Sequence, residues 1–267
     1  MIRRIVVGAS IAAAGWAGYY GIRRWWATWG VVPDEQTRSL PGDELLPDGT
    51  NLLTRGITID APPEAVWPWL VQMGFGRGGW YSYDQLDMKG TSAEAIVPEL
   101  QKIAVGDTLP THPDGGFEVR LVEPNRALAV YLDGEIVKGW QKKPAESIST
   151  KETPGLAMSG SFLGTASPQD FKIEWAWVLE PAGPSQTRLI ERTRGWFGEG
   201  NAASKATMPM LGFGVFVMMR RQMLGIRDRA ERLARLEGIE REVAVAVPIA
   251  TGEGNGSTPK EAVAPAG

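Results

Sequence analysis

The chain has 267 residues, no cysteine and one histidine, and its formal net charge is −3 at pH 7. The missing cysteines exclude disulfides, thiolate metal sites and thiol nucleophiles, and a single histidine excludes a histidine-rich metal site. The weak negative charge provides no global field that would attract nucleic acid. With a hydrophobic content of 43%, the chain can bury a core. We therefore expect a globular domain with no metal, no other cofactor and no nucleic-acid partner.

The first thirty residues contain an uncharged apolar run, residues 5–22, between two pairs of arginines. A helix of about 18 residues is about 27 Å long, just enough to cross the hydrocarbon of a bilayer. The flanking arginines and the tryptophans that follow the run are typical of membrane interfaces. Residues 1–30 are therefore predicted to be a single-pass membrane anchor, with the side of the membrane left open. A cleaved signal peptide and a soluble apolar helix are the alternatives.

Two segments lack hydrophobic periodicity. Residues 31–50 combine proline, glycine and acidic residues and are expected to form a linker or an extended lead-in. Residues 238–267 consist mainly of small and polar residues and are expected to be a disordered tail. The folded domain is therefore expected to occupy residues 51–237.

The run GFGRGG at residues 74–79 matches the spacing of a dinucleotide-binding loop. Such a loop must follow a strand and open a helix. Residues 53–60 alternate as a strand, but residues 63–73 then repeat at helical spacing, with Pro68 kinking the helix and Gly74 ending it. Because the glycines follow a helix, we expect a turn and no nucleotide partner. The turn is expected to display Trp80, Tyr81, Tyr83 and Asp84.

The remaining elements are predicted from hydrophobic periodicity. Residues 92–103 are expected to form a short helix capped by Ser92. Alternation predicts strands at residues 107–110, 117–123, 127–132, 171–180 and 187–196. One apolar face predicts a long helix over residues 215–236, which Gly238 is expected to end. Residues 133–169 form an insertion, for which we favour disorder over a functional lid.

This order of elements resembles the SRPBCC or START-like superfamily. The resemblance rests on TRGITIDAPPEAVWPWLVQMG, GRGGWYSYD and FVMMRRQMLGIRDRAERL, covers about residues 52–237, and is closest to uncharacterised membrane-anchored bacterial members. It implies an α+β helix-grip fold, in which an antiparallel β-sheet curves around a long C-terminal helix, here preceded by an N-terminal transmembrane helix. Lipid-transfer START domains and polyketide cyclases have this fold.

Candidate ligand-binding residues lie where this fold would be hollow. Trp175 and Trp177 share the apolar face of their strand, because side chains alternate along a strand. On the last strand either Glu191, or Arg192 with Arg194, must face inward and could orient a polar head group. Core packing for the apolar residues, and solvent exposure for the charged ones, are the alternatives. The full candidate set is Trp80, Tyr81, Tyr83, Asp84, Trp175, Trp177, Glu191, Arg192 and Met219.

Acid–base candidates are few. Asp84 lies among aromatic residues that could raise its pKa, although such a residue more often caps a turn. His112 lies between prolines and has no nucleophile or orienting carboxylate to work with, so no catalytic role is assigned to it. The lack of a dense polar constellation favours a membrane-anchored binding protein for a hydrophobic small molecule or lipid. The alternative is an enzyme of the polyketide cyclase or dehydratase type.

Overall fold

The computed structural model describes residues 17–87, 90–113, 115–141, 171–198 and 202–246. The chain divides into two units, residues 1–234 and residues 235–267. The first unit contains the β-sheet and all the sites considered below. The second unit is described only as helical residues, 235–246.

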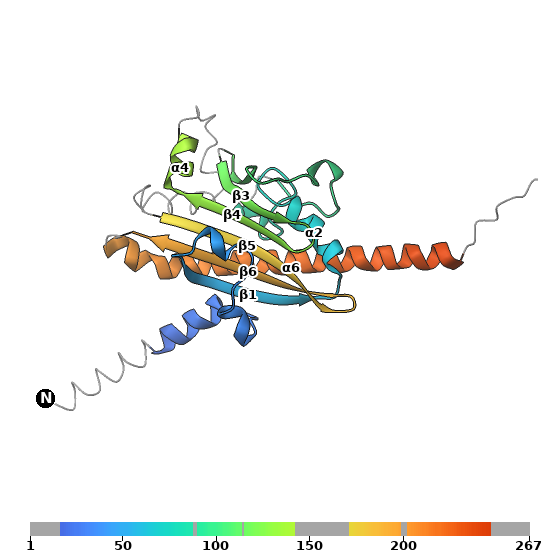
Figure 1. The fold of residues 1–267 in the computed structure, drawn as a ribbon, viewed down its shortest axis with the longest axis horizontal. Coiled ribbons are helices and arrows are strands. Elements are labelled where there is room, and N and C mark those ends of the chain that lie inside the picture. The colour runs from blue at the N-terminus through green and yellow to red at the C-terminus, as the bar shows by residue number, and fades with distance from the viewer. Residues whose placement is uncertain (1–16, 88–89, 114, 142–170, 199–201, 247–267) are drawn as a thin grey trace, which may run out of the picture. The chain divides into compact units, whose positions relative to one another are not determined.

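The described residues of the first unit form one six-stranded antiparallel sheet with the strand order β1-β6-β5-β4-β3-β2 (Figure 1). The strands are β1 (Thr50–Ile59), β2 (Thr108–His112), β3 (Gly115–Glu123), β4 (Ala127–Asp133), β5 (Phe171–Gly183) and β6 (Gln186–Phe197). Each strand predicted from alternation is found, with ends that differ by a few residues. Sequential strands from β2 to β6 are neighbours, whereas β1 pairs with β6 and so forms the opposite edge.

Two helices pack on one face of the sheet, which we call the inner face. Helix α2 (Pro63–Val71) begins with proline at its first turn and buries Val66 and Trp69. The other is helix α6 (Ala202–Ala246), which passes behind the sheet in the view of Figure 1. Its Met223 and Ile226 join α2 and the inner-face residues of the strands in the main hydrophobic core. An antiparallel sheet that packs on a long C-terminal helix fits a helix-grip-like α+β fold.

The glycine run lies where the sequence predicts it. Helix α2 ends at Val71, and Gly74 and Gly79 then pair in an isolated β-bridge that closes a tight loop. Both glycines have positive φ, 124° and 90°, a backbone conformation that favours glycine. The chain then continues to Trp80 and Tyr81, and the next helix, α3 (Asp84–Asp87), is one turn long. The prediction of a turn after a helix is confirmed.

The helix expected at residues 92–103 is wrong. The structure has only one 3-10 turn there, η3 (Pro98–Leu100). The side-chain amide of Gln72 binds this segment on both sides, donating to the Ala95 carbonyl oxygen at 3.2 Å and accepting from the Val97 N–H at 2.9 Å. These tertiary hydrogen bonds hold the backbone in an extended form that its helical propensity does not favour.

The expected end of the long helix is also wrong, because α6 continues past Gly238 to Ala246. Gly238 is not among the glycines with positive φ, so it does not form the left-handed cap that ends a helix. Residues 238–246 of the expected tail are therefore helical, and residues 247–267 lie outside the described residues. In the insertion, α4 (Gly134–Gln141) buries Val137 against Leu132, and residues 142–170 lie outside the described part.

Near the N-terminus, residues 17–27 are helical. No helix in the described part of the chain combines the length and apolarity needed to cross a membrane. Most of the apolar run at residues 5–22 lies outside the described residues. Trp26, which follows the run, is buried, and Trp29 packs against the main core.

Residues 31–49 cross the outer face of the sheet, and we call them the N-terminal strap. The strap contains two 3-10 turns, η1 (Pro33–Gln36) and η2 (Asp43–Leu45), in the segment expected to be a linker. Leu40 is buried in a small cluster with Val178 and Ile190. Arginines that point outward from β6 bind the strap, because alternate side chains of one strand reach the same face. Arg188 pairs with Glu35 at 2.7 Å in this way.

Gly42 of the strap packs tightly against the outer face of the sheet. It has a φ of 104°, and a Cβ there would lie 2.9 Å from Glu174 Oε1 and 3.0 Å from the Ala129 Cβ. We expect Gly42→Ala to lower the free energy of unfolding by about 2–4 kcal/mol, through backbone strain and overpacking together. Gly76→Ala is the control, since Gly76 also has positive φ but open space around it. Equal losses in urea unfolding would contradict tight packing at Gly42.

Candidate functional site

A buried arginine and a buried glutamate lie opposite each other on the inner face of the sheet. The strand register places Arg55 of β1 opposite Glu191 of β6, and Glu191 opposite Trp177 of β5. Residues that are directly opposite in an antiparallel sheet point to the same face, so the three side chains form one row. All three are almost completely buried. Charged residues are seldom buried to this extent unless they are paired or serve a ligand.

Arg55 is held from three sides. Its Nε donates to the Trp26 carbonyl oxygen at 3.1 Å, and its Nη1 lies 3.1 Å from the Met219 sulfur. The guanidinium carbon lies 5.2 Å from the centre of the Phe216 ring. Burial lowers the pKa of Arg55 to about 10, opposed by the charge of Glu191, so Arg55 is still a cation at neutral pH. Its Nη2 has no hydrogen-bond partner among the described residues.

Only one carboxyl oxygen of Glu191 has a hydrogen bond to a described residue. Its Oε1 accepts a hydrogen bond of 2.8 Å from the indole Nε1 of Trp175. Its Oε2 has no partner in the described part of the chain. Burial raises the pKa of Glu191 to about 7, against the opposing effects of Arg55 and the Trp175 hydrogen bond. Near neutral pH this carboxyl group can therefore gain or lose a proton, and its free oxygen can donate or accept.

Aromatic rings next to Arg55 and Glu191 form an apolar surface, which we call the aromatic wall. The rings of Trp175 and Trp177 have centres 4.3 Å apart, and Trp80 from the loop after the glycines stacks on Trp175 at 5.7 Å. Phe117 of β3 meets Trp175 edge-on at 5.8 Å. Trp175 and Phe117 are only partly buried. The site therefore joins an apolar surface to a buried charged end.

Further buried polar atoms on the same side lack partners. Thr193 lies two residues beyond Glu191 on β6 and directly opposite Trp175, and its hydroxyl has no hydrogen bond to a described residue. The Gln222 carbonyl oxygen on α6 is also unpaired, while its amide nitrogen contacts the Met73 sulfur at 3.4 Å. Each unpaired buried polar group costs about 1–3 kcal/mol, so such groups call for an explanation.

The structure brings together five of the residues predicted from sequence. Trp80, Trp175, Trp177, Glu191 and Met219 all belong to the inner-face site described above. Sequence analysis left open whether Glu191, or Arg192 with Arg194, faces inward from β6. In the structure Glu191 faces inward.

The other predicted residues have different surroundings. Tyr81 is buried, and its hydroxyl donates to the Trp69 carbonyl oxygen at 3.0 Å. Asp84 accepts hydrogen bonds from the Ser92 N–H and hydroxyl, at 2.8 Å and 2.6 Å, and so fastens the loop. Tyr83 is exposed, and Arg192 points to the outer face under the strap.

Sequence analysis missed Arg55. The signal was present, since Leu53, Ile57 and Ile59 define the inward positions of β1 and Arg55 occupies the remaining position of that alternation. A charged residue in an apolar row indicates a buried charge and therefore a partner or a ligand.

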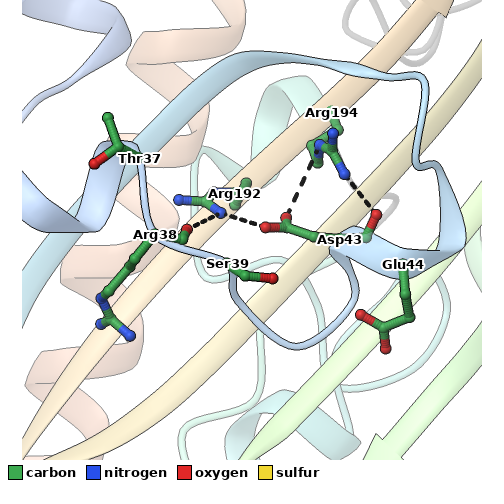
Figure 2. A pocket seen from close by; sticks show the side chains of 7 residues that line it. All are labelled: Thr37, Arg38, Ser39, Asp43, Glu44, Arg192 and Arg194. Carbon is green, nitrogen blue, oxygen red and sulfur yellow. Dashed lines mark hydrogen bonds and ion pairs between the residues drawn. The ribbon is translucent and has the colours of Figure 1, made fainter.

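A second, polar cleft lies on the outer face, between the strap and β6 (Figure 2). It has a volume of about 350 Å³ and is lined by Thr37, Arg38, Ser39, Asp43, Glu44, Arg192 and Arg194. Its charged groups already bind one another. Arg192 Nη1 donates to Asp43 Oδ2 at 2.6 Å, and both terminal nitrogens of Arg38 donate to Glu180. We therefore interpret the charged groups of this cleft as contacts that hold the strap on the sheet. Nor do the described residues contain a cluster of three acidic or histidine side chains able to hold a metal ion.

Comparison with known proteins identifies no family. No family model matches the chain, and no curated protein matches it. Among solved structures, a protein from Mesorhizobium loti is similar at 18% identity and a TM-score of 0.31, over 67% of this chain and 97% of that one. A protein from Arthrobacter aurescens is similar at 15% identity and a TM-score of 0.34, over 67% and 85%. CalU16 from Micromonospora echinospora is similar at 14% identity and a TM-score of 0.26, over 68% and 84%. Likenesses this weak carry no statement about what the chain binds.

Proposed function

We propose that the domain is a binding protein for an amphipathic small molecule or lipid, held between the inner face of the sheet and α6. The apolar part of the ligand lies against Trp80 and Trp175, and its polar group meets Arg55 and Glu191. The observation that carries this proposal is the buried pair itself, in which Arg55 Nη2 and Glu191 Oε2 both lack a partner in the described part of the chain beside an aromatic wall.

The energetics of the pair support a ligand with a polar head. A buried charge that is incompletely hydrogen-bonded is costly, and a ligand oxygen that binds Arg55 Nη2 would recover part of that cost. A charge-assisted hydrogen bond is about twice as strong as a neutral one. The aromatic wall adds the burial of apolar area, at about 25 cal/mol per Å². Together they favour a carboxylate, or another acceptor group, at the end of a hydrocarbon chain or ring system.

The N-terminal apolar run supports a ligand drawn from a membrane. As a helix, residues 5–22 are long enough for the hydrocarbon core of a bilayer, and they lead directly into the helix whose Trp26 carbonyl binds Arg55. A membrane anchor at this point would keep the binding domain within reach of lipids.

Extraction and titration test the proposal. Organic extraction of the purified full-length chain, followed by mass spectrometry, is expected to release an amphipathic molecule. In titrations with oleate followed by indole fluorescence, we expect Arg55→Met to weaken binding by about tenfold or more, because a charged hydrogen bond is lost. Lys172→Met is the matched control, since Lys172 is an exposed cation on β5 whose ammonium faces Trp196. Equal losses in the two variants, or no response to oleate in the parent chain, would contradict the proposal.

A second candidate function, acid–base catalysis, rests on Glu191. A carboxyl group with a pKa of about 7, oriented by the Trp175 indole, has the properties of a general acid or base. Such an enzyme of the cyclase or dehydratase type would lose turnover in Glu191→Gln but keep its affinity for substrate. A simple binding protein would show no turnover in either form.

A further inference from the structure

A helix near the N-terminus leaves most of its apolar side chains exposed. Every residue from 17 to 25 is exposed, and the first buried side chain is that of Trp26. Tyr19, Ile22 and Trp25 lie three residues apart and therefore on one face of the helix, with 41%, 61% and 57% of their surface exposed. A short helix with a bare apolar face is marginal in water, so a partner that covers this face would stabilise it.

The beginning of α6 extends this exposed surface. Phe213 is 49% exposed. Phe216 joins the two segments, because its ring centre lies 6.1 Å from that of Phe213 and 5.4 Å from that of Trp25. Two segments that are far apart in the sequence therefore form one continuous aromatic surface. Clusters of exposed apolar side chains of this kind mark interaction sites.

The charges around the surface all have the same sign. Arg23 and Arg24 lie on the N-terminal helix, and Arg220 and Arg221 lie on α6. The sequence has no acidic residue in residues 1–33 or in residues 200–227, although the whole chain has a net charge of −3. Arg220 stacks on Trp29 at 4.7 Å, and the other three form no ion pair with any described residue. The surface is thus complementary to a negatively charged partner.

We propose that this surface docks on the anionic headgroups of a lipid bilayer. The docking surface consists of Tyr19, Ile22, Trp25 and Phe213 with the arginines Arg23, Arg24, Arg220 and Arg221. Aromatic rings and arginines are the side chains that favour the membrane interface, and anionic lipids attract each basic residue near the surface. The apolar run at residues 5–22 overlaps this helix in the sequence. This proposal goes beyond ligand binding and does not depend on it.

The docking surface lies one aromatic ring away from the buried pair. Phe216 contacts Trp25 on one side and carries the guanidinium of Arg55 on the other, at 5.2 Å. Docking would therefore place the charged end of the inner site just behind the membrane interface.

The absence of cysteine allows a direct test with single labels on the full-length chain. Phe213→Cys places a nitroxide label on the docking surface. Val105→Cys places the same label in the loop before β2, on a side chain that is 62% exposed. Both proteins are reconstituted into vesicles of phosphatidylcholine alone and of phosphatidylcholine with phosphatidylglycerol at three to one. On the mixed vesicles, the label at 213 is expected to become accessible to lipid-dissolved oxygen and protected from a water-soluble nickel chelate, while the label at 105 stays in water.

The arginines are tested on the labelled background. Removing one basic residue near the surface is expected to lower the ratio of docked to undocked label about fivefold, so Arg221→Gln should do so. Arg126→Gln, an exposed arginine in the turn before β4, should leave the ratio unchanged.

Three results would overturn the proposal. The first is a label at 213 that stays as water-accessible on mixed vesicles as the label at 105. The second is equal protection on both kinds of vesicle, which would remove the role of anionic lipid. The third is protection without vesicles that grows with protein concentration, which would make a second copy of the chain the partner. Loss of oleate binding in Arg55→Met tests the inner site separately, so failure of one proposal leaves the other intact.

Discussion

Glu174→Gln is expected to stabilise the domain above neutral pH. Glu174 is completely buried on the outer face of β5, and neither of its carboxyl oxygens has a hydrogen-bond partner in the described residues. Burial raises its pKa from 4.5 to about 8, and the neighbouring carboxylate of Asp43 adds to the rise. Arg192 and Arg194 oppose it, but less strongly. The native protein therefore keeps this carboxyl group protonated at neutral pH.

The direction of the pH effect follows from the two pKa values. A group that is harder to ionise in the native state favours folding while it is protonated, so its contribution is fully present below pH 4.5. That contribution is lost progressively as the pH rises towards 8. An amide has nearly the same shape and no proton to lose. At pH 9 we expect Glu174→Gln to raise the free energy of unfolding by about 3 kcal/mol relative to the parent chain.

Urea unfolding between pH 5 and pH 9 measures this difference. Glu191, with a pKa of about 7, adds its own loss of stability at lower pH, so the interval between 7 and 8 is the part specific to Glu174. Glu118→Gln, at a partly exposed ion pair with Arg120, controls for replacing a carboxylate by an amide. The same slope above pH 7 in Glu174→Gln and the parent chain would show that Glu174 is already ionised in the fold.

Arg192→Met is expected to release the N-terminal strap and to cost about 3–5 kcal/mol of unfolding free energy, because it breaks the ion pair of the buried Arg192 guanidinium with Asp43 and leaves carbonyl oxygens of the strap without their donor. Figure 2 shows the guanidinium of Arg192 bound to the strap at Asp43 and Arg38. Its Nη1 donates to Asp43 Oδ2 and to the Arg38 carbonyl oxygen at 3.0 Å, and its Nη2 donates to the Glu35 carbonyl oxygen.

Arg126→Met is the matched control for this prediction. Arg126 also forms an ion pair, with Glu123 at 2.6 Å, but its side chain is 64% exposed, so its loss should cost less than about 1 kcal/mol. Urea unfolding gives both energies, and limited trypsin digestion at Arg38 reports whether the strap has left the sheet. A loss in Arg192→Met as small as in Arg126→Met, with Arg38 still protected, would mean that the strap is held by other contacts.

Alternation was a good guide to the strands because it reflects the two faces of a sheet directly. The strand expected from residue 171 begins at Phe171, and the one expected from residue 187 begins one residue earlier, at Gln186. The helix expected at residues 92–103 failed for a different reason. Its backbone is bound by the side chain of Gln72, which is about twenty residues away in the sequence, and local propensity contains no information on such a contact.

The candidate site could be predicted only in its aromatic half. Trp175 and Trp177 follow from the period of one strand, whereas the pairing of Arg55 with Glu191 requires the register between β1 and β6. These strands are more than a hundred residues apart, so the register is set by long-range packing. The strap was missed because its contacts are made by single side chains, such as Leu40 and Asp43, without any periodicity.

The hydrogen bond from Arg55 to the Trp26 carbonyl has a practical consequence for anyone who shortens this chain to make it easier to purify. Cutting at residue 31 would remove the apolar run and leave all six described strands. The product could therefore still give the spectrum of a folded protein. It would also remove the Trp26 carbonyl from Arg55, the Trp29 carbonyl from Gly56 and the Gly30 carbonyl from Arg188. Measurements on that product would describe an altered inner face. A shortened chain should therefore begin no later than residue 17.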